Sequence, residues 1–171
     1  GATATLALDG ARRAAVVATV VVALQIALGG WTSSNYAAVS CPDFPTCQAQ
    51  WIPDGMDYAD AFVLWRGLDI NYTGGVLEHP ARVAIHFTHR VGAIVATLAV
   101  LVAALLTLRA ASTGLLRNGA WWAIGALAAQ LLIGIFMVLE TFPLPLAAGH
   151  NGGAALVLLA MLLLNRRLRE A

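Results

Sequence analysis

Four long stretches of mostly apolar residues, separated by polar segments, dominate the pattern of the chain. They cover 14–31, 83–108, 121–139 and 146–164. A helix needs about 20 apolar residues to cross the hydrocarbon core of a bilayer. Each stretch is predicted to be a transmembrane helix, because a helix satisfies its own backbone hydrogen bonds in lipid. The pattern therefore predicts an all-α membrane protein built as a four-helix transmembrane bundle.

The composition supports a membrane protein and gives no sign of nucleic-acid binding. Apolar residues make up 60% of the chain and charged residues 11%, against about 25% charged residues in an average soluble protein. A soluble domain of this length needs more polar surface than these residues supply. The formal net charge is +1, and no basic run interleaved with aromatic residues suggests a nucleic-acid site.

The arginines predict which side of the membrane each end of the chain occupies. Those before the first span, between the second and third spans and after the fourth fall on one side: Arg12, Arg13, Arg109, Arg117, Arg166, Arg167 and Arg169. Cytoplasmic loops carry an excess of Arg and Lys. We therefore expect a multi-pass membrane protein with both termini in the cytoplasm and the connection 32–80 outside.

The external connection 32–80 is too long for a simple turn. Within it, Tyr58, Phe62 and Trp65 are spaced i, i+4 and i+7, which predicts a short helix with one aromatic face. That face fits the membrane interface, where Trp and Tyr concentrate. Packing over the top of the bundle is the alternative, and the sequence does not separate the two.

Two cysteines lie close together in the same external connection. Cys41 and Cys47 flank a short segment that contains two prolines. The extracytoplasmic side of the membrane permits disulfides, so we expect these two cysteines to be joined. Two free thiols or a metal pair are the alternatives, although two cysteines alone do not supply the four ligands of a typical zinc site.

Two histidines lie inside different apolar stretches, each near the end that faces away from the cytoplasm: His89 and His150. An ionisable side chain in hydrocarbon is costly and indicates a functional site, and imidazole is a common axial ligand of haem iron. The second and fourth spans run in the same direction, so we expect these two histidines to bind one haem iron between them. A hydrogen bond between helices is the competing interpretation of a lone intramembrane histidine.

The neighbours of His89 extend this candidate site. His86 lies one turn further out on the same helical face and competes with His89 as the ligand. Arg90 lies well inside the span and needs a negative partner. Haem propionates would serve, and so would Glu140 at the outer end of the third span.

Glycines surround His150 in the fourth span. Gly149 and Gly153 are four residues apart, a spacing that allows two helices to approach closely. The same glycines would leave room for a flat macrocycle beside the histidine, and both interpretations can hold together.

Four segments of the chain form a specific combination of motifs. They are the stretch Ala27-Leu28-Gly29-Gly30-Trp31-Thr32-Ser33-Ser34-Asn35-Tyr36, the segment Cys41–Cys47, the stretch Ile85-His86-Phe87-Thr88-His89-Arg90-Val91-Gly92-Ala93 and Gly149-His150. Together they resemble the second half of bacterial haem A synthase over nearly the whole chain. Members of that family have two similar four-helix halves, each with a histidine on its second and fourth helix. In the first half a glutamate lies three residues before the His-Arg histidine. Here that position is His86, which indicates the second half and predicts that this chain alone is not catalytically competent.

The resemblance implies an oxidoreductase that converts haem O to haem A by oxidising a ring methyl group to a formyl group. The chain is then a single domain, the haem b-holding half of an eight-span protein. Expected partners are haem O and haem A, the N-terminal half, haem O synthase and membrane lipid, with no nucleic acid. His89 and His150 would be the axial ligands, Arg82 and Arg90 would face the propionates, and His86 would line the pocket.

Two other functions are compatible with the sequence. One is a membrane electron carrier of the cytochrome b type that exchanges electrons with quinone. The other is a non-haem assembly or scaffold protein, in which the histidines only join helices. An optical spectrum of the purified chain separates the scaffold protein from the two haem proteins.

Overall fold

Four long helices make up most of the structure, a computed structural model that describes residues 2–171. They are α1 (Ala2–Ser34), α3 (His79–Ala110), α4 (Gly114–Leu139) and α5 (Leu144–Arg169). The connection between α1 and α3 contains a 3₁₀ turn, η1 (Ala38–Ser40), and a single helical turn, α2 (Tyr58–Ala61). Residues 2–171 form no β-strand that belongs to a sheet. The prediction of an all-α bundle is confirmed, and each predicted span lies inside one long helix.

All four long helices are long and apolar enough to cross a membrane. The two shortest, α4 and α5, each contain 26 residues, which is about 39 Å at 1.5 Å per residue. The hydrocarbon core of a bilayer is about 30 Å thick. Many Leu, Val and Ile side chains on these helices are exposed on the outside of the bundle. The protein is therefore a multi-pass membrane protein, and these exposed side chains face lipid.

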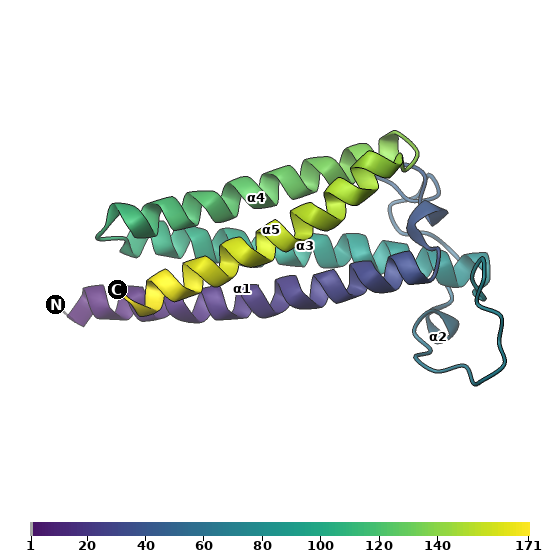
Figure 1. Cartoon of the computed structure of the whole chain (residues 1–171), viewed down its shortest axis with the longest axis horizontal. Helices are drawn as coiled ribbons and strands as arrows, with labels where there is room; N and C mark the ends of the chain where they lie inside the picture. Colours follow the sequence, from purple (N-terminus) through teal and green to yellow (C-terminus); the bar gives the residue numbers. More distant parts are fainter. Residues whose placement is uncertain (1) are drawn as a thin grey trace.

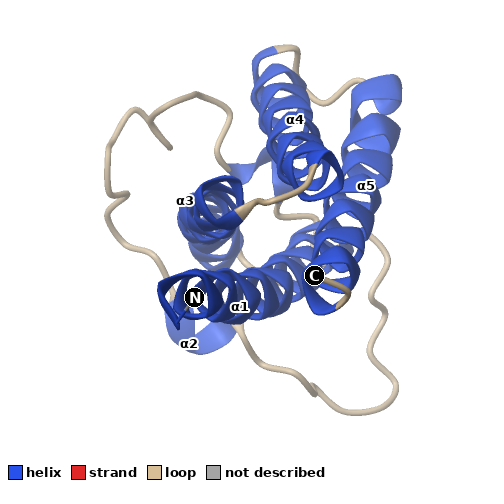
Figure 2. Cartoon of the chain, turned by 90° about the vertical axis from the view of Figure 1, so that its left-hand side faces the viewer, coloured by secondary structure: helices blue, strands red, loops and turns tan. Residues whose placement is uncertain are grey.

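The four helices form a quadrilateral in cross-section (Figure 2). Helix α1 packs on α3 and α5, and α4 packs on the same two helices. The most extensive contacts join successive spans, α1 with α3 and α4 with α5. The bundle is therefore a pair of helical hairpins, and the second and fourth spans, α3 and α5, lie diagonally opposite each other.

The two ends of the bundle differ in what they hold (Figure 1). Both chain termini lie at one end, which we name the terminal end. The long connection between α1 and α3 lies at the other end, which we name the loop end. Helix α5 lies beside α1 near the C-terminus and approaches α4 toward the loop end. The two hairpins are therefore closest to each other at the terminal end.

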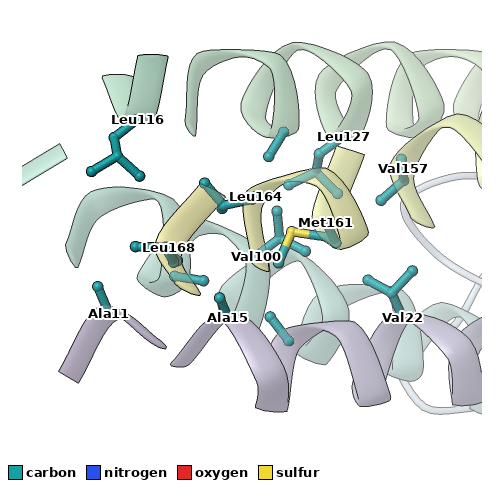
Figure 3. Packing of buried hydrophobic residues seen from close by; sticks show 13 residues of the cluster. Ala11, Ala15, Val22, Val100, Leu116, Leu127, Val157, Met161, Leu164 and Leu168 are labelled. Atoms are coloured by element: carbon teal, nitrogen blue, oxygen red, sulfur yellow. The ribbon is translucent and has the colours of Figure 1, made fainter. Parts of the chain in front are cut away.

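The main apolar core fills the terminal half of the bundle (Figure 3). All four helices contribute to it, and its largest fully buried side chains are Val100, Leu116, Met161, Leu164 and Leu168. Its buried members reach no further toward the loop end than Val22 on α1, Val100 on α3, Leu127 on α4 and Val157 on α5. The loop half of the bundle is thus built from a different set of side chains.

A smaller apolar cluster attaches the external connection to the first turns of α3. It contains Ala37, Ala61, Leu77, Ala81, Ala84 and Ile85. The indole nitrogen of Trp31, at the end of α1, donates a hydrogen bond to the carbonyl oxygen of Ala61 at 3.0 Å. This bond ties α2 to the bundle, so the connection is anchored at the loop end.

The predicted aromatic face of the loop helix is wrong, although a short helix is present. Helix α2 begins at Tyr58 but ends at Ala61, so Phe62 and Trp65 lie beyond it. The guanidinium of Arg66 donates to both the backbone carbonyl and the carboxylate of Asp60, at 2.6 Å each. A continued helix would need that carbonyl for its own i→i+4 bond, so the arginine replaces the next turn.

Candidate functional site

The two intramembrane histidines lie in the loop half of the bundle, on the diagonally opposed helices. His89 is ten residues beyond the start of α3 at His79, and His150 is six residues beyond the start of α5 at Leu144. Both side chains are half-buried, and both helices run from the loop end toward the terminal end (Figure 1). The structure therefore places in the same half of the bundle the two imidazoles that the direction of the spans suggested as partners.

Helix α1 holds the ring of His89 through a glutamine and a glycine. The amide nitrogen of Gln25 lies 3.1 Å from Nδ1 of His89 and donates to the carbonyl oxygen of His89 at 2.9 Å. A Cβ atom at Gly29 would lie 3.1 Å from Cε1 of the same ring. A Cβ atom at Gly92 would collide with Oε1 of Gln25. Glycine is thus needed at both positions: Gly29 leaves space for the imidazole, and Gly92 leaves space for the amide.

Helix α4 holds the ring of His150 through the same two residue types, but at the other ring nitrogen. The amide nitrogen of Gln130 lies 3.3 Å from Nε2 of His150. A Cβ atom at Gly134 would lie 2.9 Å from Cε1 of His150, and one at Gly153 would collide with Oε1 of Gln130. Among residues 5–171, Nδ1 of His150 and Oε1 of Gln130 are buried without a hydrogen-bond partner.

His86 is engaged differently from His89. Its side chain is buried, and its Nε2 accepts a hydrogen bond from Nε of Arg90 at 3.3 Å. Its ring meets Phe142, in the turn between α4 and α5, edge to face at 6.4 Å between centroids. Of the side chains described, none donates to or accepts from Nε2 of His89. On helix α3 these contacts favour His89 over His86 as the ligand. On helix α5, by contrast, Nε2 of His150 would have to leave the amide nitrogen of Gln130 to bind iron.

Arg90 fastens the disulfide loop to helix α3. Its two terminal nitrogens donate to the carbonyl oxygens of Thr46 at 2.6 Å and Cys41 at 2.8 Å, and its guanidinium carbon lies 5.9 Å from the centre of the Phe44 ring. Asp43 adds a negative charge nearby. In the described structure Arg90 therefore interacts with this loop, not with Glu140.

The expected disulfide between Cys41 and Cys47 is confirmed, with 4.6 Å between the Cα atoms. Asp43 organises the turn that the disulfide closes. Its carboxylate accepts hydrogen bonds from the hydroxyl of Thr46 and from the backbone N–H groups of Gln48 and Ala49. The Thr46 hydroxyl bond, followed by the backbone bonds, lowers the pKa of Asp43 below its usual value. The loop carrying the Arg90 contacts is thus a compact, braced unit.

Arg82 lies on α3 closer to the loop end than His86. Its Nε is buried and has no hydrogen-bond partner among residues 5–171. A buried guanidinium N–H left without an acceptor is costly. It is therefore a suitable donor for an anionic group at the loop end, such as a carboxylate.

Sequence reasoning missed the two glutamines and did not assign Gly29 or Gly134 to the site. The available signal was a polar amide inside an apolar stretch, followed four residues later by glycine. It occurs at Gln25 on α1 and again at Gln130 on α4. Amide side chains between membrane helices often form interhelical hydrogen bonds, so the repeated spacing indicates a common polar contact.

The chemistry of these side chains fits the two axial positions of a haem. Two imidazoles approach from opposite helices, glycines keep the adjoining helix surfaces free of side chains, and the main apolar core ends before this level. Within residues 2–171 no group of three or more His, Cys, Asp or Glu side chains is placed to hold a bare metal ion. A haem iron needs only two further ligands, because the porphyrin supplies four.

Comparison with known proteins gives consistent results. The family model described as cytochrome oxidase assembly protein, COX15-CtaA, matches residues 2–162. A protein named heme A synthase from Shewanella oneidensis is 41% identical over 151 residues, which is 88% of this chain and 44% of that protein. Heme A synthase from Paracoccus denitrificans is 34% identical over 132 residues, or 77% of this chain and 31% of that protein. The chain spans less than half the length of these relatives, and no solved structure matches it.

Proposed function

Because the chain belongs to the COX15-CtaA family of cytochrome oxidase assembly proteins, we propose that it holds a haem b for the synthesis of haem A. The observation that carries the proposal is the position of His89 and His150 in the loop half of the two diagonally opposed helices, each beside a glycine that leaves space for its ring. Imidazole pairs of this kind suit a haem iron. The family assignment makes haem the natural ligand for them.

Each residue of the site would have a distinct role toward the haem. His89 and His150 would bind the iron through their ring nitrogens. Arg82, whose buried Nε lacks an acceptor, would donate to a propionate at the loop end. Arg90 would add positive charge there while it holds the disulfide loop over the site. The haem itself would supply one-electron transfer, and the protein fixes its orientation and keeps water away.

We propose that the complete protein oxidises a ring methyl group of haem O to the formyl group of haem A. The relatives named heme A synthase support this, and each is more than twice as long as the part that this chain matches. The remaining length would include an N-terminal four-helix half that acts on haem O. Haem O synthase is the natural supplier of that substrate.

Two measurements test this proposal. The purified full-length protein should show the optical spectrum of a low-spin haem b, and haem extraction should identify the b type. Cells that supply haem O and carry the full-length protein should accumulate haem A, as measured by extraction and chromatography. A purified protein without haem would contradict the haem site, whereas haem b without formation of haem A would favour an electron carrier.

We also propose that the protein lies in the bacterial inner membrane with both termini in the cytoplasm. The excess of arginines at the terminal end of the bundle supports this orientation, and the disulfide at the loop end supports an oxidising compartment there. Reporter fusions after Arg109 and after Ala171 should both report cytoplasm. An extracytoplasmic signal from either fusion would contradict the orientation.

A further inference from the structure

The two helical hairpins carry the same four residues at matching positions. In α1 and α3 they are Gln25, Gly29, His89 and Gly92, and in α4 and α5 they are Gln130, Gly134, His150 and Gly153. In both hairpins the glutamine precedes a glycine by four residues, and the histidine precedes a glycine by three. Each glutamine also lies nine residues before the last residue of its helix. The two hairpins of the four-helix unit therefore repeat the same pattern of glutamine, histidine and glycine residues.

The contacts repeat along with the residues. In each hairpin the glutamine amide lies within hydrogen-bond distance of a ring nitrogen of the histidine, at 3.1 Å for Gln25 and 3.3 Å for Gln130. In each, the glutamine occupies the space that a side chain at the glycine of the next helix would need. An amide in hydrocarbon is costly unless it finds a partner. Each amide thus fills a space left by a glycine and faces a histidine ring.

We propose that Gln25 and Gln130 are positioning residues for the iron, one for each imidazole. This inference rests on the proposed function, in which His89 and His150 bind a haem. Each glutamine would fix the rotation of one ring and accept a hydrogen bond from its Nδ1–H through the amide oxygen. Neither glutamine would touch the iron.

The chemistry of a bound imidazole explains why an acceptor is needed. A histidine that binds iron through Nε2 carries its proton on Nδ1, and that N–H almost always meets an oxygen acceptor. In α5, Nδ1 of His150 and Oε1 of Gln130 are both buried without a partner, while the amide nitrogen of Gln130 lies beside Nε2 of His150. The ring of His150 would therefore turn over to free Nε2 for iron and bring Nδ1–H to the amide oxygen. In α3, the amide nitrogen of Gln25 lies beside Nδ1 of His89 and donates to the carbonyl oxygen of that residue. A half-turn of this amide would present its oxygen to Nδ1–H in exchange for the bond to the carbonyl.

The acceptor has a measurable electronic effect. A hydrogen bond from Nδ1–H to an oxygen raises the basicity of the ligating nitrogen. A more basic ligand stabilises ferric over ferrous iron, so the midpoint potential of the haem falls. Loss of the acceptor should therefore raise the potential as well as weaken the binding of haem.

The test uses the full-length protein with Gln25→Met or Gln130→Met. Methionine is unbranched and of similar length, but its thioether is a much weaker hydrogen-bond acceptor. We expect the affinity for added haem b to fall about 10- to 100-fold, with a higher midpoint potential and shifted electron paramagnetic resonance g values. Thr97→Val is the matched control, because the hydroxyl of Thr97 bonds only within its own helix, to the carbonyl of Ala93.

A second pair of variants keeps the acceptor. Gln25→Glu and Gln130→Glu should hold the midpoint potential at or below that of the unaltered protein, which a merely structural role for the glutamines does not predict. If the Met variants match Thr97→Val in affinity, potential and g values, the inference is wrong. The same conclusion follows if the Glu variants show a raised potential. An effect at Gln25 but none at Gln130 would overturn the inference for the hairpin of α4 and α5.

Failure of this inference can be distinguished from failure of the proposed function. If His89→Ala and His150→Ala lose the low-spin haem while the Gln variants behave as the control, the haem site stands and only the positioning role fails. If the His variants retain the haem with unchanged spectra, the proposed ligation itself is wrong.

Discussion

The terminal and loop halves of the bundle use the same four helices in opposite ways. In the terminal half, apolar side chains from all four helices meet in one core around Met161 and Leu164. In the loop half, imidazoles, amides and glycines occupy the contacts of α1 with α3 and of α4 with α5. One half is filled by apolar side chains, and the other carries the polar side chains of the proposed haem site.

The difference shows how a membrane bundle can hold a large cofactor. Lipid tails are as apolar as leucine, so burial of apolar surface contributes little to association, and close packing contributes more. The packed terminal half therefore fixes the four helices relative to one another. The loop half can then hold the two imidazoles in place although the main apolar core does not reach them.

Removal of either proposed ligand should have the largest effect on the loop half. We expect His89→Ala and His150→Ala each to abolish or convert the low-spin haem spectrum, because one axial position is then left without its imidazole. His86→Ala should leave the spectrum largely intact, since Nε2 of His86 is engaged by Arg90. Optical and electron paramagnetic resonance spectra of the purified variants check this.

Two outcomes would revise this assignment in different ways. If His86→Ala loses the haem and His89→Ala does not, the ligand lies one helical turn closer to the loop end. If none of the three substitutions changes the spectrum, the haem site does not lie in this half of the protein.

A cavity in the terminal half should destabilise the bundle and leave the spectrum of the folded protein unchanged. Leu164 is fully buried, whereas Leu162, two residues earlier on α5, is 49% exposed toward lipid. Leu164→Ala should lower the free energy of unfolding by about 2 kcal/mol, near the low end for buried leucines. Leu162→Ala is the matched control and should change it little. Unfolding in detergent and denaturant, followed by circular dichroism, measures both.

The sequence predicted the terminal half more fully than the loop half. Long apolar stretches are enough to predict four helices, because each must satisfy its own backbone bonds in lipid. The placement of His89 and His150 at the same end of the bundle followed from the shared direction of the second and fourth spans, whereas the diagonal arrangement of the two helices was not predicted. The aromatic periodicity after Tyr58 was misleading, because the bond from Arg66 to Asp60 ends the helix, and a bond between side chain and backbone leaves no periodic signal.

The disulfide should contribute to the stability of the loop end alone. Cys41→Ser with Cys47→Ser should lower stability by about 2 kcal/mol on the chain-entropy estimate for a short loop. The loss should loosen the carbonyl groups that Arg90 binds, at Cys41 and Thr46. Protease cleavage within the loop should therefore become faster, while the core around Leu164 stays protected. Mass spectrometry of non-reduced protein should find the two thiols of the unaltered protein joined, and two alkylatable thiols would contradict the disulfide.

The contacts that define the site were harder to predict than its histidines. Gln25 and Gln130 lie among apolar residues, and only the packing of α1 on α3 and of α4 on α5 places them beside imidazoles. The partners of Arg90 were also unexpected, because backbone carbonyls at Cys41 and Thr46 are available to it only once the disulfide loop has folded back. Long-range contacts of this kind are set by the fold.

The smallest expected effect comes from adding a methyl group at the glycines beside the two imidazoles. Comparison with glycines elsewhere on the helices distinguishes loss of space for the rings from a change in helix stability. Gly29→Ala places a methyl group 3.1 Å from Cε1 of His89, and Gly134→Ala places one 2.9 Å from Cε1 of His150. Each should displace its ring and weaken haem binding by about 1 kcal/mol, the lower end of the cost of overpacking, with the larger effect at Gly134. Gly30→Ala and Gly125→Ala are the controls, since a Cβ there meets nothing within 4 Å, and alanine favours a helix over glycine. Haem titration of the four variants measures the difference, and equal affinities in all four would show that the glycines beside the rings are not needed for space.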